Sequence, residues 1–138
     1  MPVENVAVPI LDSKDAPWAT EKAIEIYGKT KARVHLVNVQ PAYSKDISQF
    51  FNARDLARFH REDGLRVLAP VMSGLDKAEV PHWEHVLVGR KVERIVEFVT
   101  THRCGEVVLR DRPRHLLTRL GFASVNSELR RALKALYQ

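Results

Sequence analysis

Short apolar runs alternate with segments of helical periodicity along the whole chain, and this alternation limits the folds that it can adopt. The expected strands cover 3–10, 34–39, 82–88 and 106–109, and the expected helices cover 17–29, 47–78, 92–99 and 124–136. The long second helix has possible interruptions near Gly64, Pro70 or Gly74. Strands that alternate with helices in this way predict an α/β fold with a parallel sheet covered on both faces.

Composition predicts an ordinary single domain over residues 1–138. The chain is 45% hydrophobic and 28% charged, which is enough apolar material for one core. No basic and apolar leader is visible in MPVENVAVPI, and no run is long enough to span a bilayer. Cys104 is the single cysteine, so an intramolecular disulfide is excluded, and a reducing, cytoplasmic location is expected.

The excess of positive over negative charge is confined to the end of the chain. The net charge is +5, from 22 basic and 17 acidic residues. Residues 110–138 hold seven basic and two acidic residues, which gives +5, so 1–109 balance at fifteen against fifteen. Such asymmetry is typical of an anion-binding face, and equally of a solvated helix and loop.

Four motifs in order give the chain a resemblance to a known family. They are VAVPILDS, VHLVNVQP, VPHWEHVLVG and RIVEFVTTHRCGEVVL, and the resemblance that they carry extends over nearly the whole chain. In this order the chain resembles the universal stress protein family. The resemblance implies a doubly wound, Rossmann-like open sheet of strand order 3-2-1-4. The family's fifth strand, P-V-L-V-V, is expected to be absent, because the sequence closes on Ala135-Leu136-Tyr137-Gln138.

The same resemblance marks the positions that bind nucleotides in the family. An aspartate follows the first strand of such members, and Leu11 stands there in this chain, with Asp12 next to it. Val39 matches the position whose backbone meets the adenine. The phosphate loop G-x2-G-x9-G-[ST] reads Arg110, Pro113, Ala123 and Ser124, so all three glycines are replaced. The resemblance therefore predicts that ATP is not bound in the usual way.

The lost glycines have a direct physical consequence. Glycine turns at a helix N-terminus hold phosphate with backbone N–H groups, but Pro113 has no N–H, and Arg110 places a long side chain there. Arg110, Arg112 and Arg114 share one side of an extended loop, and with Ser124 they could hold an anion. Alternatively, they pair with carboxylates such as Asp111 or Glu106, and Ser124 caps the last helix. The candidate ligand set is Asp12, Val39, Arg110, Arg112, Ser124 and Val125.

The remaining reactive residue types give no catalytic pattern. His82 and His85 are three apart on a strand, which places them on opposite faces and defeats metal chelation. His35 is expected to be a hydrogen-bonded interior residue. Surface or capping roles are expected for the isolated histidines, and a half-buried, unreactive role for Cys104. Those isolated histidines are His60, His102 and His115.

These observations favour a binding or regulatory module of the stress response, and not an enzyme. A nucleotide- or anion-binding member with an altered, arginine-rich site is the alternative. No cofactor or metal is expected, and specific nucleic-acid binding is disfavoured because no aromatic residues are interleaved with the arginines. An exposed fourth strand, 107–109, predicts a homodimer, because an open strand edge can pair with a second copy.

Overall fold

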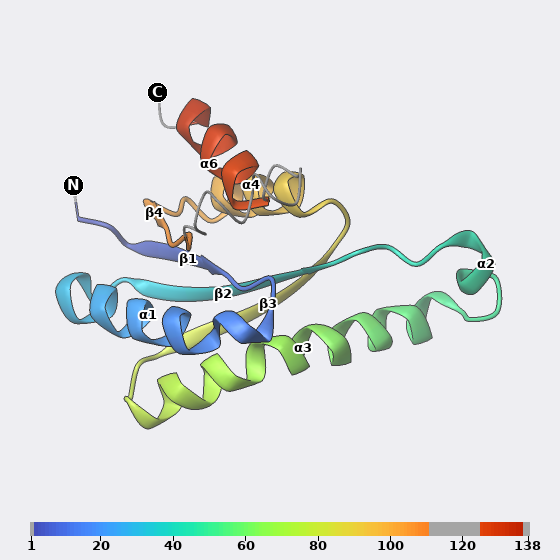
Figure 1. The fold of residues 1–138 in the computed structure, drawn as a ribbon, viewed down its shortest axis with the longest axis horizontal. Coiled ribbons are helices and arrows are strands. Elements are labelled where there is room, and N and C mark those ends of the chain that lie inside the picture. Colours follow the sequence, from blue (N-terminus) through green and yellow to red (C-terminus); the bar gives the residue numbers. More distant parts are fainter. Residues whose placement is uncertain (1, 111–124, 137–138) are drawn as a thin grey trace, which may run out of the picture.

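Four parallel strands form the centre of the molecule. The computed structural model describes residues 2–110 and 125–136. The strands are β1 (Asn5–Pro9), β2 (Arg33–Gln40), β3 (His82–Val88) and β4 (Glu106–Val107). All of their pairings are parallel, in the order β3-β2-β1-β4 (Figure 1). This order confirms the predicted 3-2-1-4 sheet.

Helices cover both faces of this sheet. They are η1 (Ser13–Asp15), α1 (Ala16–Thr30), α2 (Lys45–Ser48), α3 (Ala53–Lys77), α4 (Lys91–Thr101) and α6 (Val125–Leu136). Figure 1 shows α1 and α3 on one face, and α4 and α6 on the other. Among the described helices, none is long and apolar enough to cross a membrane.

The alternation of side chains along β2 divides the core into two halves. Val34 and Leu36 point toward α1 and α3 and are fully buried there. Val37 and Val39 point the other way, into the half that contacts α4 and α6. A strand with two covered faces reads as a continuous apolar run, which is why 34–39 looked buried in the sequence.

The predicted helix over 47–78 begins later than expected and is not interrupted where glycine and proline suggested. A short α2 ends at Ser48, and α3 starts at Ala53 because the Asn52 side chain accepts a hydrogen bond from the N–H of Asp55 at 2.8 Å. The helix then continues through Pro70. Its Gly64 lies against β3, where a Cβ atom would come within 2.5 Å of the Val86 side chain.

The fourth strand is shorter than the predicted 106–109. Regular pairing with β1 covers Glu106 and Val107, and one further hydrogen bond joins the N–H of Val108 to the carbonyl of Ala7 at 2.9 Å. At the other edge, β3 has the predicted bounds 82–88. Gly89 ends it with φ of 138°, a conformation that glycine adopts without strain.

Candidate functional site

The carboxyl ends of β1 and β4 meet where the chain leaves the sheet toward opposite faces. After β1 it enters η1 and α1 on one face, and α6 follows β4 in sequence on the other (Figure 1). Open α/β sheets bind ligands in the crevice at such a switch point. We call the residues around it, Leu11, Asp12, Asp15, Val39 and Arg110, the carboxyl-end crevice.

Arg110, which follows β4, contacts residues of η1 and α1, which follow β1. Its Nη1 atom lies 3.0 Å from Oδ1 of Asp15, and its guanidinium lies over the Trp18 ring, 5.9 Å from the ring centroid. The Asp15 side chain is 18% exposed and that of Arg110 44%. One predicted arginine is therefore in the crevice, paired with a carboxylate that the sequence did not single out.

Asp12, a predicted ligand residue of the crevice, has a structural role. Oδ1 of Asp12 accepts a hydrogen bond from the N–H of Lys14 at 2.9 Å, so Asp12 is the N-cap of η1. Leu11, at the position of the family's aspartate, packs against the half of the core that α4 and α6 cover. An apolar side chain thus stands at the position where the resemblance predicts the family's aspartate.

Val39 lies at the edge of the crevice, but its side chain belongs to the core. It is 2% exposed and stands two positions beyond Val37, the last β2 residue paired with β1. Next to it, the buried amide of Asn38 donates to the carbonyl of Ile10 at 2.8 Å and accepts from Nε2 of Gln40 at 2.6 Å. This pair of amides, which sequence reasoning missed, ties the end of β1 to β2. A buried asparagine in an apolar strand was the available signal.

The other predicted anion ligands cannot be placed around the crevice. Arg112 and Ser124 lie outside the described residues. Val125 is the first residue of α6, and its side chain also lies outside the description. The joint anion site of Arg110, Arg112 and Ser124 stays a prediction.

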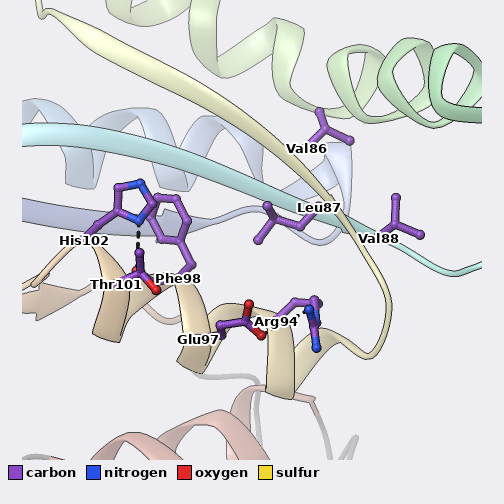
Figure 2. Close-up of a pocket in the computed structure, with 8 residues that line it drawn as sticks. All are labelled: Val86, Leu87, Val88, Arg94, Glu97, Phe98, Thr101 and His102. Carbon is purple, nitrogen blue, oxygen red and sulfur yellow. Dashed lines mark hydrogen bonds and ion pairs between the residues drawn. The ribbon is translucent and has the colours of Figure 1, made fainter. Parts of the chain in front are cut away.

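A pocket lies away from the crevice, between β3 and α4. It encloses about 380 Å³ and has both apolar and charged walls. Figure 2 shows its lining residues: Val86, Leu87, Val88, Arg94, Glu97, Phe98, Thr101 and His102. Arg94 and Glu97 form an ion pair across one helical turn at 3.1 Å. The sequence did not predict this pocket.

Histidines gather beside that pocket. His35 is buried as predicted, and its ring nitrogens lie 3.0 Å from Oδ1 of Asn5 and 3.0 Å from Nε2 of His85. His102 stacks on Phe98 and its Nδ1 lies 3.1 Å from the Phe98 carbonyl, which is the predicted capping role. The proximity of His102 to the other two rings was missed, because 102 is far from both in the sequence.

The other histidines in the described part of the chain lie elsewhere. His82 points to the opposite side of β3 from His85, as predicted, with Nδ1 2.9 Å from the carbonyl of Val80. The expected surface position of His60 is wrong. Its ring is 7% exposed and stacks on Tyr43 with centroids 4.2 Å apart, because α3 turns that side toward the segment after β2.

Burial sets the protonation of these groups. Desolvation, and then the neighbouring His85, His102 and Arg33, lowers the pKa of His35 to about 4. Desolvation and His102 also lower the pKa of His85. Burial raises the pKa of the Cys104 thiol to about 11, so the group is a thiol at neutral pH and not a reactive thiolate. Within residues 2–110 and 125–136, no cluster of His, Cys, Asp or Glu has a geometry that could hold a metal ion.

Comparison with known proteins identifies relatives of this arrangement. A sequence model of the universal stress protein family matches residues 2–134. A universal stress protein solved in complex with cAMP is similar in fold, with a TM-score of 0.65, 17% identity and coverage of 95% of this chain and 90% of that one. A protein of the universal stress protein family from Burkholderia pseudomallei has a TM-score of 0.58 and 18% identity, and the match covers 78% of this chain and 81% of that one. Protein Rv1636 of Mycobacterium tuberculosis H37Rv has a TM-score of 0.57 and 18% identity, and the match covers 97% of this chain and 91% of that one. No curated protein sequence matches the chain.

Proposed function

The chain belongs to the universal stress protein family, and we propose that it is a binding or regulatory module of the stress response that does not bind ATP in the usual way. The proposed role is one of binding and not of catalysis, in the cytoplasm. It rests on the crevice, where other members bind nucleotides and where this chain has replaced the residues that do so.

The ion pair between Arg110 and Asp15 carries this proposal. In a glycine-lined loop, backbone N–H groups approach the phosphates closely. Here a guanidinium reaches across the same crevice and lies 3.0 Å from a carboxylate. Leu11 adds an apolar side chain where the family's aspartate would be. ATP in the usual pose would have to displace this pair without the backbone donors that hold its phosphates.

A second candidate is an arginine-dependent site for a small anion or a mononucleotide. Arg110 offers a fork of donors that matches a phosphate, and Trp18 next to it offers an aromatic face. The similar fold solved in complex with cAMP supports a ligand of this size. In this candidate, Arg110 exchanges Asp15 for the phosphate.

Thermal shift measurements distinguish these two functions. Inorganic phosphate and AMP are each added to the parent protein and to Arg110→Ala. Arg66→Ala is the matched control, because Arg66 also pairs with an aspartate, Asp63 at 2.9 Å, but lies on α3. The anion site predicts a rise in Tm that Arg110→Ala removes and Arg66→Ala retains. An equal rise in all three proteins, or none in the parent, contradicts the anion site.

We also propose that the protein is a homodimer. β4 is an edge strand with a short pairing to β1, and an edge of this kind can be covered by a second copy. Val108 is unsuitable for testing this contact, because its side chain is buried in the α1–α3 half of the core. Sedimentation equilibrium tests the proposal directly: a dimer is expected, and a monomer at high protein concentration contradicts it.

A further inference from the structure

Three imidazole rings from three different elements meet on one side of the sheet. They belong to His35 of β2, His85 of β3 and His102 at the end of α4, and we call them the histidine trio. The ring centroids are 5.2 Å apart for His35 and His85, 5.6 Å for His35 and His102, and 5.5 Å for His85 and His102. Phe98 packs against all three rings. The trio therefore joins an edge strand, a central strand and a helix end through groups that can gain protons.

The hydrogen bonds fit three neutral rings. Oδ1 of Asn5 only accepts, so Nε2 of His35 carries its proton and Nδ1 of His35 is left as an acceptor for the N–H of His85. Nδ1 of His102 donates in the same way to the carbonyl of Phe98. A proton added to Nδ1 of His35 makes that atom a donor, so Nε2 of His85 must become the acceptor of this hydrogen bond. If His85 is also protonated, both atoms carry a hydrogen, and the two N–H groups face each other.

The surroundings offer these rings little negative charge. From β2, the charged group that acts on His35 is Arg33, which also opposes protonation. From β3, Glu84 favours protonation of His85, but its carboxylate lies 3.8 Å from Arg61 of α3, on the opposite face. From α4, the carboxylate beside the trio is that of Glu97, which is paired with Arg94. β1 contributes the neutral amide of Asn5.

We propose that the histidine trio is an acid-sensitive latch, and that protonation of these rings releases β3 and the end of α4 from each other and widens the pocket between them. The pocket wall includes both Phe98 and His102, so separation of the rings opens that wall (Figure 2). Within residues 2–110 and 125–136, β3 is an edge strand that pairs with β2 alone, so it is the strand that we expect to move. The low pKa of His35 supports the latch, because it means that the closed state excludes protons. This inference is independent of the proposed function of the crevice.

Trp83 provides the reporter for the test. It lies on β3, 5.9 Å from His35 between ring centroids, and is 44% exposed. A Trp18→Phe background leaves Trp83 as the sole tryptophan. Quenching of its fluorescence by acrylamide, which carries no charge, is measured between about pH 7.5 and pH 4.5, the range in which histidines change charge. The latch predicts a rise in the quenching constant of about twofold or more on acidification, with far-UV circular dichroism retained.

Two variants decide whether the trio causes this change. His35→Gln/His85→Gln/His102→Gln removes the three titrating rings and is expected to abolish the rise. His82→Gln, on the same strand but the opposite face, is the matched control and is expected to retain it. A rise that survives in the triple variant, or that is lost in His82→Gln, overturns the proposal. So does a parent protein whose Trp83 does not respond to acid.

A second measurement covers the case in which the triple variant does not fold. NMR spectra of the histidine ring protons in the parent protein follow each titration directly. The latch predicts that the trio takes up protons at the same pH at which Trp83 becomes accessible. Protonation of the trio while the quenching of Trp83 stays constant would refute the latch.

Discussion

The carboxyl-end crevice and the histidine trio are polar regions at two places on this sheet, and they differ in how their charge is balanced. In the crevice, the Arg110 cation has the carboxylate of Asp15 at 3.0 Å, and next to the crevice the Asn38 amide both donates and accepts. In the trio, the three imidazole rings lie close to one another, and their hydrogen-bond partners from other residues are the Asn5 amide and the Phe98 carbonyl. A paired charge tolerates a change of pH, whereas clustered bases whose nearby carboxylates are already paired with arginines do not. The acid sensitivity of the protein should therefore come from the β3–α4 side.

The largest expected effect is a loss of stability in acid. The pKa of His35 is about 4 in the folded protein, against 6.5 when unfolded, so the unfolded state binds more protons below pH 6.5. The stabilisation is complete above pH 6.5 and disappears as the pH falls toward 4. The difference of 2.5 pKa units corresponds to about 3 kcal/mol, at 1.36 kcal/mol per unit. Urea unfolding at several pH values measures this loss.

His35→Gln is the variant that checks the source of that loss. It should flatten the pH dependence of the unfolding free energy between about pH 6.5 and 4, even where its stability at neutral pH is lower. A slope equal to that of the parent would place the acid sensitivity elsewhere in the molecule.

A smaller effect is expected from the amides of Asn38 and Gln40, next to the crevice. Asn38→Ala leaves the Ile10 carbonyl without its side-chain donor in a buried place, which should cost about 1–3 kcal/mol of unfolding free energy. Gln40→Ala is the comparison, and should cost less because Gln40 is only half-buried. Unlike the loss from the trio, the loss in Asn38→Ala should be the same at neutral and acid pH. A strong pH dependence would break the contrast between the two regions.

The smallest effect on stability is expected for Asp15→Asn. Its ion pair with Arg110 is partly exposed, so its removal should change the unfolding free energy by less than about 1 kcal/mol. The same change removes the carboxylate that competes for Arg110, and so should strengthen phosphate binding in a fluorescence or thermal shift titration. Weaker phosphate binding in Asp15→Asn would show that the carboxylate is not a competitor.

The fold was predicted well because its signals are local. The apolar run 82–88 gave β3 its correct bounds, and the spacing of apolar residues gave α1 to within a residue at each end. The break before α3 was missed because it depends on the cap at Asn52 and not on the glycines or the proline within the helix. Local hydrogen bonds, more than breaker residues, set the bounds of that helix.

The two polar regions were harder to predict because both depend on distant contacts. Asp15 and Arg110 are 95 residues apart, and the sequence offered several carboxylates for the arginine. The trio requires the register that places His35 opposite Trp83, two residues before His85. A register shift of one residue would turn His85 to the other face, and no local pattern specifies that choice.

The most direct test of the altered crevice is a calorimetric titration of the parent protein with Mg-ATP. At protein concentrations of tens of micromolar, roughly the range that detects micromolar affinities, we expect no saturable heat. The reasons are the apolar side chain of Leu11, the ion pair of Arg110, and the missing glycines at 110, 113 and 123. A one-site isotherm with Mg-ATP would contradict this account and show that the crevice binds ATP although Arg110 is paired with Asp15.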